Sequence, residues 1–255
     1  MLAFDRQGSG PPLLLLHGTN SSRSIWKPLI PTLSRSHEVI TVDLPAHGES
    51  PASSYAPPDW ATDLSRFIDE LGLERLAIVG HSSGGWTALE LAKLGRASAV
   101  LALTPAGLWR RHSPLITDAI LDLNWRAGQI LGKVAIAPVR TRVGRRLALR
   151  QISAAPADVP ADQAIAMVSS VLSSKNFPEH FRQTRRLRFL GGQGISAQVP
   201  VHVVWGDRDR IARARPSRHT QELPAHARIE TWERCGHMVM WDAPQRLLEA
   251  VLALP

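Results

Sequence analysis

The sequence holds a single cysteine, Cys235, and this excludes an internal disulfide. It holds no apolar run near the roughly 20 residues that a membrane-spanning helix needs, and the run Leu13–Leu16 is short enough for a buried strand. The opening stretch MLAFDRQGSGPP lacks the charged region followed by an apolar region that is typical of a signal peptide. From these absences we expect a cytoplasmic protein without a membrane span.

The sequence has few negative charges: it contains 22 aspartates and glutamates but 30 lysines and arginines, which gives a net charge of +8. Such a balance is typical of proteins that bind nucleic acid or anionic lipid. The arginines are scattered, however, and no stacked-aromatic motif or zinc-finger spacing accompanies them, so we expect no nucleic-acid partner. The sequence also shows no metal-ligand cluster and no phosphate-binding G-x-x-x-x-G-K-[ST] loop, so we predict no metal and no cofactor.

The sequence does contain a regular series of apolar segments. Its 255 residues, 44% apolar and 20% charged, suffice for one large domain or two small ones. The predicted buried strands are 12–18, 37–43, 75–81, 99–104, 200–206 and 227–232. The predicted helices between them are 26–33, 59–71, 83–94, 215–223 and 244–254. This alternation predicts an α/β fold with a mostly parallel sheet flanked by helices.

One long segment, 107–192, interrupts the alternation because it contains no clear strand. Its predicted helices are 115–132, 140–152, 161–174 and 178–188. We interpret it as a helical cap inserted into a core domain formed by 1–106 and 193–255. The cap should lie over the carboxyl edge of the sheet, where open α/β sheets bind ligands. Its apolar residues at helical spacing should pack on neighbouring helices or line a pocket, as for Leu115, Ile116, Leu123, Ile130 and Val171.

The segment GHSSG follows a predicted strand and opens a predicted helix, the context of a nucleophile elbow. The nucleophilic serine of such a turn is strained, and only small residues fit two positions before and after it. Ser82 has Gly80 and Gly84 at those positions, whereas Ser83 would have the bulky His81 before it. We therefore predict Ser82 as the nucleophile.

Two backbone N–H groups are predicted to form an oxyanion hole beside Ser82. Ser83 supplies one at the start of its helix, where the positive end of the helix dipole also favours negative charge. In the architecture that contains such an elbow, the residue after a His-Gly pair at the end of another strand supplies the other, and here that residue is Thr19. For His17 itself we favour a structural role in orienting its own loop.

A nucleophilic serine needs a histidine base, and the histidine needs an acid to orient it. Among ten histidines, His237 is the one placed between the last strand and the final helix. Two acids, Asp207 and Asp209, follow the strand at 200–206, and the strand at 99–104 is followed by none. Either could be the orienting acid, and the other would then hold the turn through backbone hydrogen bonds.

Five motifs in this chain resemble those of the α/β-hydrolase superfamily, in the same order and spacing. They are LLLLHGTNSS, DLPAHGES at 43–50, VGHSSGG at 79–85, VVWGDRDR at 203–210 and CGHMVMWDAP at 235–244. The resemblance implies the α/β-hydrolase fold with an abbreviated first edge, and it places the acid three residues after Gly206, at Asp209. Ala46 departs from the family's usual glycine, in a turn whose role is structural.

The resemblance also narrows the chemistry. Family members that hydrolyse haloalkanes or epoxides use an aspartate nucleophile, and Ser82 argues against both activities. Those that cleave carbon–carbon bonds usually carry Asn before the nucleophile and Trp after the histidine, where this chain has His81 and Met238. The favoured function is a serine hydrolase that cleaves a small-molecule ester, lactone or thioester through an acyl-enzyme. Acyl transfer, carbon–carbon bond hydrolysis on the same triad and a non-catalytic receptor remain alternatives. The candidate pocket residues are Trp86, Trp109, Trp125 and Met238.

Overall fold

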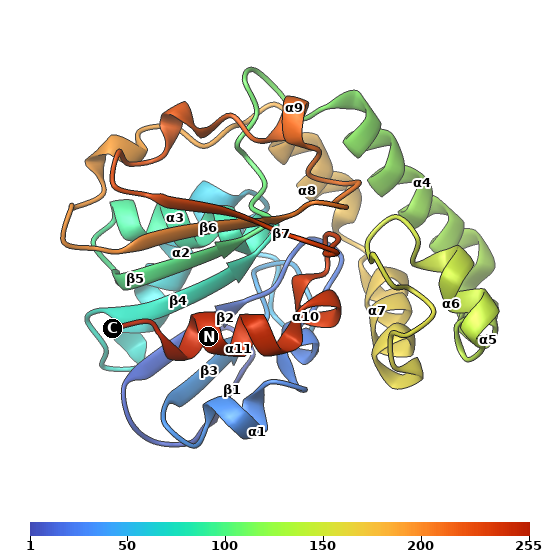
Figure 1. Cartoon of the computed structure of the whole chain (residues 1–255), viewed down its shortest axis with the longest axis horizontal. Helices are drawn as coiled ribbons and strands as arrows, with labels where there is room; N and C mark the ends of the chain where they lie inside the picture. Colours follow the sequence, from blue (N-terminus) through green and yellow to red (C-terminus); the bar gives the residue numbers. More distant parts are fainter.

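The computed structural model of the chain describes residues 1–255, apart from the side chain at position 214 (Figure 1). Its sheet has seven strands in the order β1-β3-β2-β4-β5-β6-β7. Strand β1 is antiparallel to β3, and the other neighbouring strands are parallel. The strands are β1 (Phe4–Gln7), β2 (Pro12–Leu16), β3 (Glu38–Val42), β4 (Leu76–His81), β5 (Ala97–Leu103), β6 (Val201–Gly206) and β7 (Arg228–Trp232). The predicted mostly parallel sheet is confirmed.

Helices cover both faces of this sheet (Figure 1). They are α1 (Ile30–Leu33), α2 (Pro57–Glu70), α3 (Ser83–Lys93), α10 (Val239–Asp242) and α11 (Pro244–Leu252). Leu14 and Leu16 of β2 point to the face that packs with α2 and α3, and Leu13 and Leu15 point to the face that packs with α1 and α11. Because both faces are buried, the strand is apolar throughout, which is why its sequence lacks alternation.

Two predicted core helices are wrong as continuous elements. The segment 26–33 forms the 3-10 helix η1 (Arg23–Trp26) followed by α1, because Pro28 and Pro31 lack the N–H groups that a continuous helix needs. The segment 215–223 splits into α9 (Ala214–Ser217) and η4 (Thr220–Glu222). Between these two, the Arg218 guanidinium turns back and donates to the carbonyls of Ala212 and Gly206.

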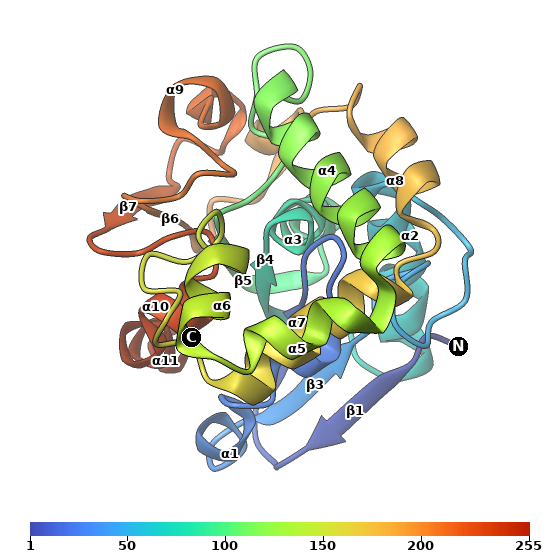
Figure 2. The ribbon, with the colours of Figure 1, turned by 90° about the vertical axis from the view of Figure 1, so that its right-hand side faces the viewer.

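The segment between β5 and β6 is helical and lies beside the carboxyl ends of the strands (Figures 1 and 2). Its helices are α4 (Leu115–Leu131), η2 (Gly132–Ala135), α5 (Ile136–Val139), α6 (Arg142–Ala148), α7 (Ala161–Ser173), α8 (Phe177–Thr184) and η3 (Gly192–Gly194). We refer to residues 107–192 as the cap. Within the described part of the chain, none of the helices combines the length and apolarity needed to cross a membrane.

The expected packing of the apolar cap residues is wrong for four of the five. Leu115, Ile116, Leu123 and Ile130 are exposed by 70%, 47%, 63% and 84%. Helix α4 instead packs on α7 through a different face, where Gly128 lies against Val171. The four side chains therefore point away from the protein.

Candidate active site

The predicted nucleophile Ser82 joins β4 to α3 in a strained conformation, with φ 54° and ψ −117°. Close backbone approaches within the turn and from the end of β2 explain the flanking glycines. A Cβ on Gly80 would lie 2.2 Å from the Gly84 carbonyl oxygen, and one on Gly84 would lie 2.3 Å from the His17 carbonyl oxygen. Any side chain at either glycine would push the turn open. Helix α3 begins at Ser83, so the N–H groups of its first turn have no partner within the helix.

His237 and Asp209 form a buried pair. The distance from His237 Nδ1 to Asp209 Oδ2 is 2.9 Å, and Oδ1 accepts the N–H groups of Ile211 and Ala212 at 2.8 Å each. Burial raises the pKa of the Asp209 carboxyl, but the charge and hydrogen bond of His237 and the two N–H donors outweigh it and keep that pKa below its usual value. Since Nδ1 donates to this carboxylate, Nε2 of the neutral ring is the nitrogen that can accept a proton.

Asp207, the other acid left open by the sequence, has a different partner. Its Oδ1 accepts the backbone N–H of Cys235 at 3.0 Å and so joins the loop after β6 to the loop after β7. These two loops approach closely, because a Cβ on Gly206 would lie 2.1 Å from the Cys235 carbonyl oxygen. Asp207 therefore braces the loop from which Asp209 reaches His237.

A cavity of about 100 Å³ lies between the core and the cap. It is lined by all four residues predicted for the nucleophile, base and oxyanion hole, Ser82, His237, Thr19 and Ser83. Much of the remaining wall is apolar, with Ile25, Trp109, Leu121, Met167, Phe177, Phe181 and Met238. Among the described side chains, no group of three or more His, Cys, Asp or Glu residues is arranged to hold a metal ion.

Comparison with known proteins matches the chain to the model of the alpha/beta hydrolase family over residues 13–250. The chain belongs to the alpha/beta hydrolase family. Among its curated relatives, an epoxide hydrolase (EphH) of Mycobacterium tuberculosis is 36% identical over 200 residues, which cover 75% of this chain and 91% of the relative. The predicted family and fold are thus confirmed.

Solved structures of the same fold include several hydrolases. A meta-cleavage product hydrolase from Pseudomonas fluorescens IP01 has a TM-score of 0.75 at 20% identity, covering 98% of this chain and 92% of that one. The carboxylesterase CesB from Bacillus subtilis has a TM-score of 0.73 at 21% identity, covering 98% of this chain and 86% of that one. At such identities these likenesses describe the fold.

Two of the four predicted pocket residues line the cavity of this alpha/beta hydrolase, and the other two lie elsewhere. Trp109 and Met238 line the cavity, but the expectation for Trp86 and Trp125 needs correction. Trp86 is fully buried in the core, where its indole donates to Glu90 at 2.8 Å. Trp125 donates to the Ser174 carbonyl at 2.9 Å and so holds two parts of the cap together.

A hydrogen-bonded chain that the sequence did not reveal runs from the elbow to the cap. Thr19 Oγ1 lies 3.0 Å from Ser83 Oγ and 2.9 Å from Nε2 of His180 on α8. His180 Nδ1 donates to the Tyr55 carbonyl at 2.7 Å, so Nε2 of the neutral ring is an acceptor. The single hydroxyl hydrogen of Thr19 goes either to this Nε2 or to Ser83 Oγ, not to both at once. No motif marks His180, because its role depends on where the cap folds back.

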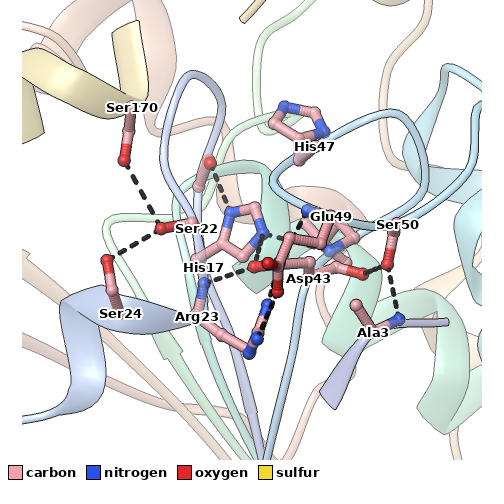
Figure 3. Close-up of polar contacts among 12 residues, drawn as sticks. Ala3, His17, Ser22, Arg23, Ser24, Asp43, His47, Glu49, Ser50 and Ser170 are labelled. Atoms are coloured by element: carbon pink, nitrogen blue, oxygen red, sulfur yellow. Dashed lines mark hydrogen bonds and ion pairs between the residues drawn. The ribbon is translucent and has the colours of Figure 1, made fainter. Parts of the chain in front are cut away.

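The loop before Thr19 is also held through His17, whose surroundings Figure 3 shows. His17 Nδ1 donates to the Gly18 carbonyl at 2.8 Å, and its Nε2 accepts the N–H of Leu44 at 3.0 Å. Asp43 accepts the backbone N–H of Arg23 at 2.7 Å and pairs with the Arg23 guanidinium (Figure 3). These contacts support the structural role favoured for His17.

Three buried histidines make the fold sensitive to acid. Burial is the main cause that lowers the pKa of His17, His81 and His180 to about 3 each. In the unfolded chain each histidine binds a proton near pH 6.5, whereas in the folded protein it stays neutral down to about pH 3. The contribution of these histidines to stability is therefore complete above pH 6.5 and decreases as the pH falls toward 3. We expect each histidine to contribute about 1.4 kcal/mol per pH unit to the slope of unfolding free energy between pH 6 and 5.

Urea denaturation at several pH values measures this slope. In the variant His180→Gln, the slope of unfolding free energy against pH should be smaller by about 1.4 kcal/mol per pH unit, the contribution of one proton. The matched variant His112→Gln, at an exposed position, should keep the wild-type slope. Equal unfolding free energies at pH 7 and pH 5 in the wild type would contradict the neutral, buried state of these rings.

Proposed function

We propose that this alpha/beta hydrolase is a serine hydrolase that cleaves carboxylic esters, including lactones and thioesters, through an acyl-enzyme. The observation that carries the proposal is the shared cavity of Ser82 and His237, with His237 oriented by Asp209 at 2.9 Å. A strained serine at the start of a helix, beside a histidine with a buried carboxylate partner, matches the requirements of acyl transfer.

In the proposed reaction, His237 Nε2 takes the proton of Ser82 as its Oγ attacks the carbonyl carbon of the ester. The carbonyl π electrons move to the oxygen, and the backbone N–H groups of Thr19 and Ser83 stabilise the resulting oxyanion. Collapse of this intermediate breaks the bond to the alcohol, which leaves with the proton from His237. Water then attacks the acyl-enzyme by the same steps, and the acid is released with Ser82 restored.

The apolar wall of the cavity supports an apolar acyl or alcohol group in the substrate. The test is a hydrolysis screen over ester, thioester and lactone substrates of varied acyl length. Turnover of any of them, sensitive to a fluorophosphonate, separates this enzyme from a non-catalytic receptor. Repeating the assay with added alcohol separates hydrolysis from acyl transfer, because a transferase would form a new ester in place of the acid.

Epoxide hydrolysis is the rival suggested by the name of the Mycobacterium tuberculosis relative. A serine that opened an epoxide would form an ether, and an ether has no carbonyl carbon for water to attack. We therefore expect no sustained diol formation from a terminal epoxide by an enzyme preparation that turns over a 4-nitrophenyl ester. Continuous diol production that disappears in Ser82→Ala would contradict the ester assignment.

The hydrogen-bonded chain from Ser83 through Thr19 to His180 gives a further prediction about the oxyanion hole. Thr19→Val keeps the backbone N–H but removes the hydroxyl that fixes its direction. We expect kcat to fall roughly 10- to 100-fold, because a misdirected donor loses part of the stabilisation of the oxyanion. KM should change little, and Thr19→Ser should restore most of kcat.

A double-mutant cycle distinguishes this positioning role from a general loss of stability. If His180 acts through Thr19, the double variant Thr19→Val/His180→Ala should be about as slow as the slower single variant. A trifluoromethyl ketone adds to the serine hydroxyl and forms a hemiketal oxyanion, so its affinity should fall in parallel with kcat. If the loss of kcat in the double variant equals the product of the losses in the two single variants, and the ketone affinity is unchanged, the positioning role is contradicted.

A further inference from the structure

The outward side of the cap carries a row of aliphatic side chains. On α4, Ile116, Leu123 and Ile130 recur at intervals of seven residues, which puts them along one side of the helix, and Val134 follows in η2. Val134 is 72% exposed, in line with the exposures of the other three. Val143 and Leu147, one turn apart on α6, are 69% and 64% exposed.

This concentration is unusual for a surface. Of the 14 large hydrophobic side chains that are exposed in the described part of the chain, eight lie between residues 115 and 147. Exposed apolar residues on soluble proteins are normally scattered, and a contiguous group marks a surface that meets another apolar surface. Figure 2 shows α4, α5 and α6 as the layer nearest the viewer, and the exposures of their side chains agree that no other described segment covers this row.

The positive charge of the protein is concentrated in the same part of the chain. Residues 107–192 hold 14 lysines and arginines against 5 aspartates and glutamates, whereas the core holds 16 against 17. The cap thus accounts for the whole net charge. Lys133, Arg140 and Arg146 are exposed and lie next to the aliphatic row in sequence.

We propose that the outward side of the cap docks on an anionic lipid surface. The docking face consists of Ile116, Leu123, Ile130, Val134, Val143 and Leu147. Aliphatic side chains on outlying helices enter the boundary between headgroups and acyl chains, and flanking arginines and lysines pair with anionic headgroups. A second copy is disfavoured as the occupant, because two such faces would bring two strongly positive caps together.

Half of the docking face, Ile116, Leu123 and Ile130, lies on α4, which also contributes to the candidate active site. Leu121 of α4 lines the cavity, whereas Leu123 and Ile130 point outward. Docking would therefore bring the cavity within about one helix diameter, roughly 10 Å, of the lipid. An apolar substrate dissolved in the membrane would then have a short path to Ser82.

Vesicle co-sedimentation of the full chain tests the proposal without any need for turnover. We expect binding to vesicles of equal parts phosphatidylglycerol and phosphatidylcholine, and much weaker binding to phosphatidylcholine alone. Ile130→Glu should lower the partition coefficient roughly tenfold or more, because it places a charge in the apolar boundary. Arg140→Gln and Arg146→Gln should each lower it roughly fivefold.

Leu94→Glu is the matched control, since Leu94 is 52% exposed at the end of α3 on the core. It should leave vesicle binding unchanged, and the melting temperatures of both glutamate variants should equal that of the wild type. The proposal is overturned if the wild type does not bind anionic vesicles, or if Leu94→Glu weakens binding as much as Ile130→Glu. It is also overturned if only the arginine variants weaken binding, which would indicate a general polyanion site. Conversion of a dimer to a monomer by Ile130→Glu would assign the face to a second copy.

Discussion

Ser82→Ala should lower kcat for an activated ester by roughly 10⁴-fold or more and abolish labelling by a fluorophosphonate probe. The reason is the geometry of the turn, where Ser82 has φ 54° and the backbone packs closely around the glycines on both sides of it. This packing holds the Ser82 side chain in one place, beside the cavity. Without its hydroxyl no acyl-enzyme forms, and the remaining oxyanion donors can only assist direct attack by water. Labelling followed by peptide mass analysis, together with steady-state kinetics, measures both effects.

Ser83→Ala is the matched control for the nucleophile. Its backbone N–H remains at the start of α3, so labelling should persist and only the hydroxyl contact with Thr19 is lost. The expected kcat is therefore far above that of Ser82→Ala. Labelling that survives in Ser82→Ala and disappears in Ser83→Ala would move the nucleophile by one residue and overturn the assignment.

Asp209→Asn should reduce kcat by about 10⁴-fold while the protein stays folded. The carboxylate accepts from His237 Nδ1, and an amide in its place can donate to that nitrogen, which favours the tautomer with the hydrogen on Nε2. A ring with that hydrogen cannot take the proton of Ser82. Kinetics with an activated ester, with the melting temperature measured on the same samples, separate a chemical loss from unfolding.

Asp207→Asn provides the comparison, because it changes the same group two residues away. An amide oxygen still accepts the N–H of Cys235, so kcat should stay near the wild-type value and any effect should appear as a small loss of stability. A severe loss of kcat in Asp207→Asn, with mild behaviour of Asp209→Asn, would reverse the roles of the two acids.

The sequence determined those features whose physical cause is local. The apolar strands follow from burial of both faces of the sheet, and the glycines around Ser82 follow from backbone sterics, so short-range patterns reveal both. Six predicted strands are present, and β1 forms the abbreviated first edge that the resemblance implies. Helices broken by prolines were less predictable, because a single apolar pattern fits both a continuous helix and two short ones.

Tertiary structure alone decided the features that depend on packing between distant segments. The family resemblance already pointed to Asp209, but its pairing with His237 depends on how the loops after β6 and β7 meet. The contact of His180 with Thr19 depends on where the cap returns to the core, and no sequence pattern marks it. The sequence predicted the apolar periodicity of α4, but it did not predict which side of the helix faces the protein. Periodicity fixes which residues share a face, whereas the position of neighbouring helices fixes whether that face is buried or exposed.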